Sequence, residues 1–465
     1  METKKVSENI LSTAKQHGAE FCEVVVSRTD TSLKRIKYGQ VDQPPAGIQW
    51  GVDVGLVKNN RRKTLSFDNP AFADSIIENA IDHIDLSPEQ EIILPTEVFP
   101  PVNSVEGLYD TETAELKAEN LIAIVKQIDE ALQKENLLLS GKIAHGKGEI
   151  VYGNSLGTKQ EAEFTIATAA FFAFDKDNEF ISAYSSSGGT SLAEIETQRL
   201  IEELKKKCLL QRGKQKIDLF KGREEGEEVK IDIIVEPYFF GPIFEWLGFF
   251  GFNGLFVERG ESFIAGKIGQ KVMGDNITIK DDPFDKRTGN LGFAFDFEGR
   301  PRKSLVLIEN GVAKSAVYDT ALAKQWGKEP TGNALPPSSR SEGAAPFDLV
   351  VEGGETSIEE MIKSSQRPTL WITKLHYLGM KHYQTATMTG VVQHGTFLIE
   401  NGKVVAPVEN LRFEESIPEA LKRVEAMSPS RLVFDPRVFG SPSGLALPAM
   451  KIKEFRFIGS TKRTV

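Results

Sequence analysis

The chain has 465 residues, of which 40% are hydrophobic and 26% are charged, a composition typical of a protein that folds throughout its length. Its formal net charge of -10 argues against a surface that attracts nucleic acid or anionic lipid. We therefore expect no direct nucleic-acid binding and no membrane association. Cys22 and Cys208 cannot form a disulfide framework and should be reduced thiols. The N-terminal stretch lacks the continuous apolar core of a secretory signal, so we expect a cytoplasmic protein.

Residues 1–100 are predicted to form a first α+β unit. Apolar periodicity predicts a helix over 4–17, and the two runs that follow, 20–30 and 31–40, predict strands. A hairpin comes next, and a helix over 70–84 closes the unit. The hairpin tip carries four basic residues that could contact phosphate, although a solvated hairpin end is the simpler interpretation: Lys58, Arg61, Arg62 and Lys63.

A second α+β unit is predicted over 110–222, after a proline-rich link. It begins with a long helix over 113–135 and continues with strands at 148–154 and 162–174. Ser191 and Glu194 have the spacing of a capping box and predict the start of its last helix. The order of helix, strands and helix repeats that of the first unit, so we expect the two units to pack together in one layer.

Residues 228–465 are predicted to form a β-rich C-terminal domain with a few helices. The sequence "LIENG" occurs at 307–311 and at 398–402, and its Asn-Gly pair predicts a tight β-hairpin at each place. Capping boxes predict two helices, one starting with Ser357 and Glu360 and one with Ser416 and Glu419. The expected fold class is therefore α+β, with a layer of helices and antiparallel strands followed by a β-rich domain.

The stretch "PYFFGPIFEWLGFFGFNGLF", from Pro237 to Phe256, is as long as a membrane span, but Pro242, several glycines and a central carboxylate argue against one. A short buried helix followed by a glycine-rich turn fits better. Its single charge is Glu245. In an apolar pocket this carboxyl could serve as a general acid or base. At a helix edge it would meet water or a basic residue instead.

Other candidate sites are weaker. His376, His382 and His394 lie close together in the sequence, and three imidazoles can bind zinc, although their spacing matches no metal motif. The acidic loops at 281–285 and at Asp296 and Glu298 could bind a hard cation, although such loops are usually solvated. The sequence contains none of the common phosphate-binding or hydrolase signatures.

The order of motifs in the second half is more specific. After the aromatic stretch come "GKIGQKV", "ITIKDDP", "FDFEGRP", "LIENGV", "TGNA", "MTGVVQHGTFLIENGKV" and "LPAMKIKEFRF". This series resembles the TldD/PmbA family, whose members are described as a metal-dependent protease and its partner, and historically as modulators of DNA gyrase. The resemblance spans most of the chain and is strongest from about residue 229 onward.

The resemblance also implies which family residues correspond to Phe244, Glu245 and Phe249 in the aromatic stretch. In the catalytic TldD branch this helix carries His-Glu-x-x-x-His, with two zinc-binding histidines, a glutamate base and a distal cysteine ligand. Here the two ligand positions are Phe244 and Phe249, and only Glu245 remains. No cysteine follows Cys208, and the corresponding position falls near Phe439. The chain therefore resembles the PmbA/TldE-like branch, which lacks the zinc motif.

This resemblance implies a non-catalytic, pseudo-metalloprotease subunit. We expect no cofactor in this chain, with zinc only in a catalytic partner. The expected partners are a second copy of the chain or a zinc-bearing TldD-like relative, together with unfolded or extended peptides. Phe239, Phe240, Phe250 and Phe252 could line a substrate groove or a dimer interface, or they could be core residues. Two alternatives are an active peptidase with non-standard ligands and a protein-binding modulator of a topoisomerase such as DNA gyrase.

Overall fold

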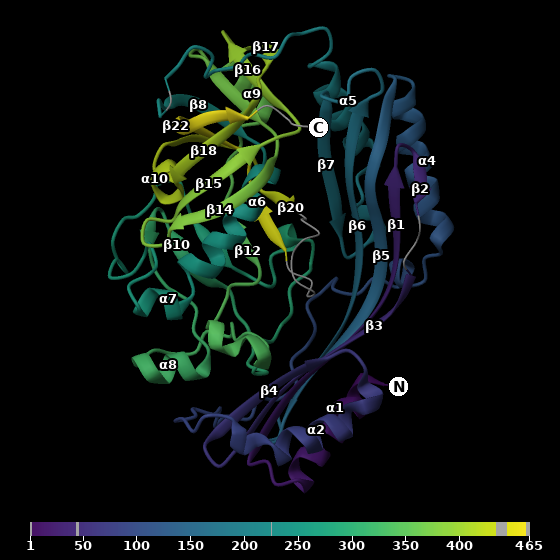
Figure 1. The fold of residues 1–465 in the computed structure, drawn as a ribbon, viewed down its shortest axis with the longest axis vertical. Coiled ribbons are helices and arrows are strands. Elements are labelled where there is room, and N and C mark those ends of the chain that lie inside the picture. Colours follow the sequence, from purple (N-terminus) through teal and green to yellow (C-terminus); the bar gives the residue numbers. More distant parts are fainter. Residues whose placement is uncertain (1, 43–45, 225, 434–443, 462–465) are drawn as a thin grey trace.

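The computed structural model describes residues 2–42, 46–224, 226–433 and 444–461. Its fold is α+β, as the sequence predicts. An N-terminal layer is built on one long antiparallel sheet, and a β-rich C-terminal domain packs beside it (Figure 1). Among the described residues, no helix combines the length and the apolar character needed to cross a membrane.

The N-terminal sheet has seven strands in the order β4-β3-β1-β5-β6-β7, with β2 paired to β1. The central pairing joins β1 from the first predicted unit to β5 from the second, from Glu23 opposite Asn154 to Ile36 opposite Gly141. The units 1–100 and 110–222 therefore share one continuous sheet. The strands are β1 (Phe21–Lys37), β2 (Gln40–Asp42), β3 (Ala46–Lys58), β4 (Arg61–Phe67), β5 (Leu137–Asn154), β6 (Lys159–Asp175) and β7 (Ser182–Gly189).

One prediction for this sheet is wrong. The runs 20–30 and 31–40 were expected to be two strands, but β1 is a single strand of 17 residues. The reason is tertiary, because β5 pairs with β1 along almost its whole length and holds its polar middle in extended conformation. The predicted hairpin is confirmed, with β3 and β4 joined through Asn59 and Asn60, both at positive φ.

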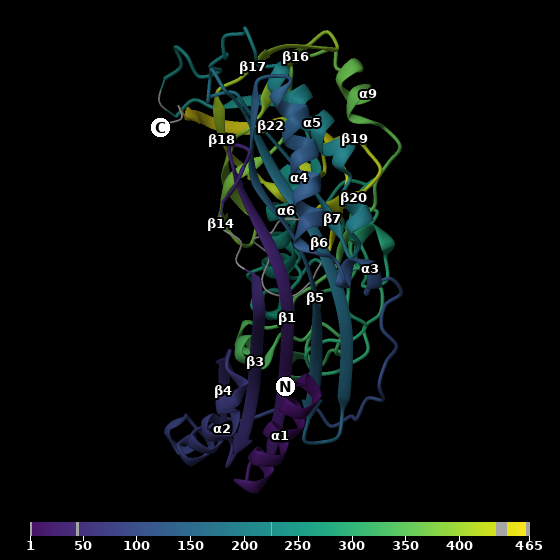
Figure 2. The same cartoon turned by 90° about the vertical axis from the view of Figure 1, so that its right-hand side faces the viewer.

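All the long helices lie on one face of the sheet (Figures 1 and 2). Helices α1 (Thr3–Gln16) and α2 (Ala73–Asp82) pack at one end, and α4 (Ala118–Gln133) and α5 (Thr197–Leu209) pack at the other. The helix expected over 113–135 is interrupted, since α3 (Thr111–Ala114) ends before α4 begins. The Ser191 capping box is formed, but it caps the short 3-10 turn η3 (Leu192–Glu194) ahead of α5.

The C-terminal domain contains a nine-stranded and a six-stranded sheet. The larger has the order β14-β15-β18-β22-β8-β13-β16-β17, with β19 paired to β22, and the smaller has the order β11-β10-β9-β12-β21-β20. The larger sheet contains β8 (Val229–Val235), β13 (Thr369–Ile372), β14 (Leu375–His382), β15 (Thr387–Val392), β16 (Thr396–Glu400), β17 (Lys403–Pro407), β18 (Asn410–Ser416), β19 (Val424–Met427) and β22 (Met450–Thr461). The smaller contains β9 (Ile279–Asp281), β10 (Leu305–Glu309), β11 (Val312–Ala313), β12 (Leu349–Val351), β20 (Arg431–Val433) and β21 (Leu445–Leu447).

Short helices fill the space around these sheets. They are α6 (Pro237–Trp246), α7 (Gly254–Glu258), α8 (Thr320–Trp326), α9 (Ile358–Lys363) and α10 (Ile417–Leu421). Helix α6 lies in the largest apolar core of the molecule, which joins residues of both C-terminal sheets. The domain covers part of the helix-free face of the N-terminal sheet, where Val25 and Tyr152 pack with Phe293 and Phe295.

Both "LIENG" hairpins are confirmed. Asn310 and Gly311 connect β10 to β11, Asn401 and Gly402 connect β16 to β17, and all four residues have positive φ. The Ser357 capping box is also confirmed, since Ser357 and Glu360 each accept a hydrogen bond from the other's backbone N–H. The Ser416 box is wrong. The Ser416 hydroxyl donates to the Thr385 carbonyl at 2.8 Å, a contact made possible by the neighbouring strand.

Gly141 offers a test of the long β5–β6 pairing. Its φ is +139°, and a Cβ added there would lie 2.2 Å from the carbonyl oxygen of Ala170 on β6. We expect Gly141→Ala to lower the free energy of unfolding by about 3 kcal/mol or more, because backbone strain and a steric clash add together. Urea unfolding followed by circular dichroism measures the loss.

Gly157→Ala is the matched control. Gly157 also has positive φ, at +110°, but a Cβ there would meet no atom within 4 Å. Backbone strain alone should lower the free energy of unfolding of Gly157→Ala by about 1 kcal/mol. Equal losses for the two variants would show that the close approach of β6 does not constrain residue 141.

Candidate functional site: the aromatic helix and the ionic network beside it

The aromatic stretch forms a buried helix, as the sequence predicts. Strand β8 ends at Val235, Glu236 keeps extended backbone angles, and Pro237 begins α6 at the first helical position, where its missing N–H has no helical partner to lose. The helix then passes into a π-helical turn over Leu247–Gly251. Gly251 is needed in this turn, since a Cβ would lie 2.5 Å from the ring of Phe263.

The two positions that the resemblance assigns to zinc ligands have different surroundings. Phe244 is 0% exposed, and its ring lies 5.6 Å from that of Phe240. Phe249 is half-buried and packs 5.0 Å from Phe250. Glu245, in the last turn of α6, is also half-buried. Apolar packing therefore occupies the first ligand position, and a phenyl ring has no lone pair to offer a metal ion. Phe439, near the expected third position, lies outside the described residues.

Of the alternatives for the four phenylalanines, a groove or interface and core packing, core packing describes three of them. Phe239, Phe240 and Phe252 are at most 1% exposed and belong to the core, because α6 is covered by both C-terminal sheets. Only Phe250 approaches the surface. It belongs to an aromatic cluster in which neighbouring ring centroids lie 5.0–6.2 Å apart: Trp246, Phe249, Phe250, Phe256 and Tyr383.

Sequence spacing could not have identified this aromatic cluster. Tyr383, which is 41% exposed, follows β14 and lies far from Phe250 along the chain, yet their ring centroids are 5.0 Å apart. The contact depends on how α6 packs against β14. The aromatic cluster is thus the part of the aromatic stretch that an outside molecule can reach.

The three-histidine zinc alternative is also wrong. The rings of His376 and His394 lie 6.5 Å apart, and His394 Nδ1 is 3.0 Å from the hydroxyl of Ser182. His382 stands at the far end of β14, six residues from His376, or about 20 Å along an extended strand. Within the described ranges, no group of three or more His, Cys, Asp or Glu side chains could hold a metal ion.

The acidic loop at Asp281 serves the structure of the C-terminal domain. Arg302 donates to both Asp281 oxygens, at 3.1 and 2.9 Å, and to Asp348 at 2.6 Å. Asn333 donates a further hydrogen bond to Asp281. Asp281 is buried, and both of its carboxylate oxygens already accept hydrogen bonds from the protein, so they are not open to a cation.

The second acidic pair and the basic hairpin tip meet at the interface between the two parts of the molecule. Arg340 donates to Glu298 at 2.6 Å and to Glu23 at 3.2 Å, and Glu23 also pairs with Arg62. The backbone N–H groups around Asp296 satisfy its carboxylate. Arg61 donates to the carbonyl of Ser87. Arg61 and Arg62 of the hairpin tip therefore bind acidic and carbonyl groups of the protein. They do not form an open phosphate site, and they are not simply solvated.

Both cysteines are buried free thiols, as predicted. Burial raises the pKa of Cys208 to about 12, with Asp175 adding to the effect, and burial also raises the pKa of Cys22. Neither thiol is suited to act as a nucleophile near neutral pH.

An ionic network that the sequence analysis missed links α5, β7 and α6. Lys207, 2% exposed, donates to Glu236 at 2.7 Å and to the carbonyl of Tyr184 at 3.2 Å. Trp371 donates to the other oxygen of Glu236 at 3.1 Å. Since Glu236 immediately precedes α6, these contacts fix where the aromatic helix begins.

The network continues through Glu203 and Tyr238. Glu203 accepts from Arg199 at 3.0 Å and from Arg431 at 3.1 Å, and the Tyr238 hydroxyl accepts from Arg199 at 2.8 Å. Burial by itself would raise the pKa of Glu203, but Lys207, Arg431 and Arg199 outweigh it and hold that pKa well below its ordinary value.

The pKa of Lys207 is raised, because Glu236 and Glu203 outweigh the lowering effect of its burial. Burial raises the pKa of Glu236 as well, while Lys207 acts to lower it. We assign the two as a charged pair because Lys207 donates to Glu236 at 2.7 Å and Trp371 donates to the other carboxylate oxygen. One sequence signal could have revealed it: Lys207 lies three residues after Leu204 and next to Cys208, on the apolar face of α5.

Residues 228–459 match the PmbA/TldA metallopeptidase C-terminal domain. An uncharacterized protein of Methanocaldococcus jannaschii is 26% identical, with 76% of this chain and 80% of that protein covered. A metalloprotease of Methanothermobacter thermautotrophicus is 28% identical, but the match spans about half of each protein, 52% in both.

Two solved structures have a similar fold. TldE from Thermococcus kodakarensis gives a TM-score of 0.83 at 20% identity, with 98% of this chain and 100% of that chain covered. A candidate modulator of DNA gyrase from Bacteroides thetaiotaomicron gives a TM-score of 0.79 at 19% identity, with 98% of both chains covered. The chain belongs to the TldD/PmbA family.

The buried pair can be tested by a double-mutant cycle. Lys207→Met and Glu236→Gln should each lower the free energy of unfolding by about 3–5 kcal/mol, because each leaves a buried group without its partner. The double variant should lose much less than the sum of the two. Thermal and urea unfolding of the four proteins give the coupling energy.

Lys206→Met is the control for this cycle. Lys206 is 49% exposed and pairs with Glu359 at the surface, so its replacement should cost about 1 kcal/mol or less. Additive losses in the Lys207 and Glu236 variants would contradict a coupled pair.

Asp319 should make stability depend on pH. Its carboxylate caps α8 through the N–H of Leu322 at 2.7 Å, and burial, followed by Glu298, raises its pKa to about 7. The unfolded pKa is about 3.9, so the folded state keeps a proton that the unfolded state has lost. This contribution to stability is complete below pH 4 and is lost as the pH rises through about 7.

Asp319→Asn should therefore flatten the stability profile between about pH 4 and pH 7, by up to about 1.4 kcal/mol per pH unit, while keeping the helix cap. Urea midpoints measured across this range test it. Asp82→Asn, an exposed site on α2, is the control and should leave the slope unchanged. A wild-type slope in Asp319→Asn would contradict the assignment.

Proposed function

We propose that this chain is a non-catalytic, pseudo-metalloprotease subunit of a TldD/PmbA-type complex that degrades or processes peptides, on the PmbA/TldE-like branch of the family. The observation that carries the proposal is Phe244, which stands at the first ligand position and is completely buried among other rings. Phe249 at the second position and the lack of any cysteine after Cys208 support it.

The chemistry of amide hydrolysis explains why these changes matter. In zinc hydrolases the metal lowers the pKa of a bound water to about 7 and so supplies the nucleophile. The residues at the equivalent positions here do not fit a zinc ion. Glu245 without a metal cannot readily generate that nucleophile, so the catalytic zinc belongs to a partner.

The role of this subunit is then to hold peptide. Strand β14 ends the nine-stranded sheet in the described part of the chain, and much of it is exposed. An extended peptide added at such an edge gains main-chain hydrogen bonds with little demand on sequence. The aromatic cluster, which includes Tyr383 just beyond β14, offers apolar contacts to the peptide's side chains.

The expected partner is a zinc-bearing TldD-like relative in the cytoplasm, and a homodimer is the alternative assembly. A protein-binding modulator of DNA gyrase is a second candidate function, favoured by two solved proteins of similar fold that are described as candidate gyrase modulators, from Bacteroides thetaiotaomicron and Thermotoga maritima. Copurification with gyrase, without peptide cleavage in any pairing, would support that second candidate. The acidic net charge of -10 speaks against direct contact with DNA.

Metal content and peptide cleavage together test the main proposal. The purified, tag-free chain should contain almost no zinc by elemental mass spectrometry, and it should not cleave a fluorescence-quenched unstructured peptide. Cleavage should appear when a zinc-bearing TldD-like relative is added, and a chelator should abolish it. About one zinc per chain, or chelator-sensitive cleavage by this chain alone, would overturn the proposal.

Glu245→Gln sharpens the same assay. Loss of a general base lowers the rate by roughly a hundredfold or more. We expect the mixture of this variant and the zinc-bearing relative to lose much less than a hundredfold of its cleavage rate, because the catalytic glutamate lies in the partner. A loss of a hundredfold or more with normal complex formation would instead make Glu245 catalytic.

A further inference from the structure

Strands β14 and β17 end the nine-stranded sheet on its two sides, and in the described part of the chain only β17 is shielded. The segment around Ile217 lies along β17. The N–H of Ile217 donates to the carbonyl of Pro407 at 2.9 Å, and Ile217 forms a bridge with Val408. Pro407 also lacks an N–H to offer a further strand. Strand β14 contains no proline and, among the described strands, pairs only with β15. An edge strand of this kind offers its backbone to another chain.

The two faces of β14 differ in character. Leu378 and Met380 pack against the core around α6. Tyr377 and Gly379 share the opposite, outer face, since a Cβ added to Gly379 would lie 3.3 Å from the Tyr377 hydroxyl. The side chains of an added strand alternate in the same way. One of its faces therefore continues the apolar core, and the other meets the outer face of the sheet.

The apolar core remains open along β14. Leu378 and Met380 are only half-buried, whereas Met388, opposite Met380 on β15, is 0% exposed. Side chains of a further strand would cover the apolar surface that β14 leaves exposed. The aromatic cluster extends this surface, because Tyr383 directly follows β14 and its ring lies 5.0 Å from that of Phe250.

The outer face is polar and carries a small excess of positive charge. Lys381 pairs with Glu414, and Arg456 pairs with Glu414 and with Glu228, each at 2.7 Å. Arg412 has no ion pair among the described residues, so three basic groups stand against two acidic ones. Acidic and uncharged polar side chains therefore suit this face of an added strand better than basic ones.

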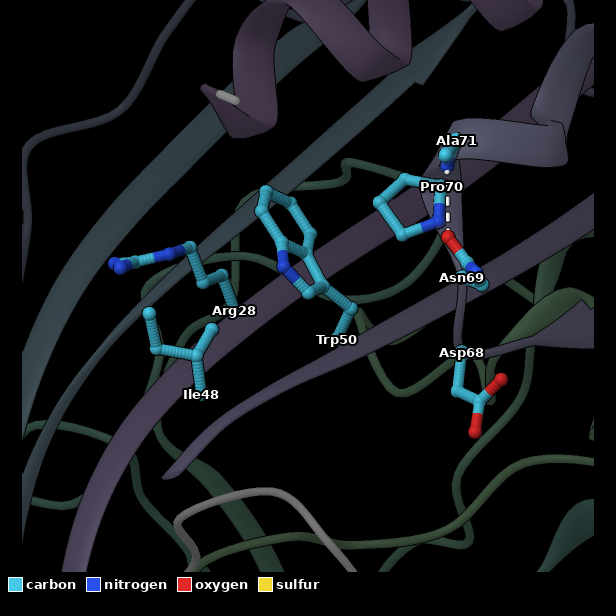
Figure 3. Close-up of a pocket in the computed structure, with 7 residues that line it drawn as sticks. All are labelled: Arg28, Ile48, Trp50, Asp68, Asn69, Pro70 and Ala71. Carbon is cyan, nitrogen blue, oxygen red and sulfur yellow. Dashed lines mark hydrogen bonds between the residues drawn. The ribbon is translucent and has the colours of Figure 1, made fainter. Parts of the chain in front are cut away.

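The hollow around Trp50 is less suited to a peptide side chain. It lies on the helix-covered face of the N-terminal layer and has a volume of about 580 Å³ (Figure 3). The Arg28 guanidinium already lies 5.9 Å from the centre of the Trp50 ring and pairs with Glu149 at 3.5 Å. Because a group of the protein occupies the aromatic face there, Trp50 can serve as an internal reference for binding elsewhere.

We propose that the β14 edge selects extended peptides by their pattern: large apolar side chains at every second position, with acidic or uncharged polar side chains between them. The apolar set packs on Leu378, Met380 and the aromatic cluster, and the polar set lies on the outer face beside Lys381. This inference rests on the proposed role of the chain in holding peptide, and it adds the class of peptide that is held. Main-chain pairing accepts any sequence, so the alternation supplies the discrimination.

The test uses the full chain, which has four tryptophans, labelled with 5-fluorotryptophan. Trp246→Phe and Trp50→Phe assign the fluorine resonances of Trp246, in the aromatic cluster, and of Trp50, in the hollow. Three peptides are titrated: alternating acetyl-Glu-Leu-Thr-Leu-Glu-Leu-Thr-amide, a block peptide of the same composition, acetyl-Glu-Thr-Glu-Thr-Leu-Leu-Leu-amide, and a lysine analogue, acetyl-Lys-Leu-Thr-Leu-Lys-Leu-Thr-amide. We expect the alternating peptide to shift the Trp246 resonance and to leave the Trp50 resonance unchanged.

The titrations also give the order of affinities. The alternating peptide should bind about five- to tenfold more tightly than the block peptide, because the block peptide places one leucine fewer on the core face. The lysine analogue should bind about twofold more weakly than the alternating peptide, because its charges meet the basic outer face.

Substitutions on the edge locate the site. Leu378→Lys should weaken binding of the alternating peptide by about tenfold, because a charge replaces apolar surface in the middle of β14. Met380→Lys is a second variant with the same expectation. Val405→Lys is the matched control. Val405 is 39% exposed on β17, the shielded edge of the same sheet, so this variant should bind as the wild type does.

Equal binding of the alternating and block peptides would overturn the proposal and leave the peptide-holding role intact. Wild-type affinity in both Leu378→Lys and Met380→Lys, tighter binding of the lysine analogue, or a shift of the Trp50 resonance in place of that of Trp246 would overturn it as well. Binding of none of the three peptides would also overturn the peptide-holding role. Because no measurement needs cleavage or a partner, the two failures are distinguishable.

Discussion

The buried ion pair between Lys207 and Glu236 is the constraint on which the arrangement of the molecule depends. It joins α5 of the N-terminal layer to the residue that precedes α6, at 2.7 Å and with both side chains almost completely buried. Two desolvated charges are tolerated only when they meet each other in good geometry and their remaining hydrogen-bonding positions are filled, here by Tyr184 and Trp371. The pair therefore permits one placement of the aromatic helix relative to the long sheet.

That placement decides what the aromatic helix can do. With its start held at Glu236, α6 lies in the largest core of the molecule, and Phe239, Phe240 and Phe244 become packing residues. The π-helical turn that follows brings Phe249 and Phe250 toward the surface, where they join Trp246, Phe256 and Tyr383. The buried part of this helix is therefore apolar support for the core, and its reachable end is the part available for contact with another molecule. The proposal of a non-catalytic subunit rests on this placement.

Much of the fold could be predicted from local sequence patterns. The Asn-Gly turns of both "LIENG" segments, the helix at residues 3–16 and the buried character of the aromatic stretch were all predictable, because each depends on backbone preferences or on nearest neighbours. The predictions that were wrong depended on distant segments. Two expected strands merged into β1 because β5 pairs along it. Helix α10 does begin after Ser416, but the Ser416 side chain does not cap it, because its hydroxyl donates to Thr385.

The sequence by itself determined that this chain is an α+β protein of the TldD/PmbA family, because motif order is written in the chain. It also determined that Phe244 and Phe249 stand where the resemblance expects zinc ligands. Only the tertiary structure decided which aromatic rings are core and which are reachable, and that His376 and His394 lie together without His382. It also decided that Lys207 meets Glu236. The physical reason is that burial and charge pairing are properties of segments far apart in sequence, and no local pattern records them.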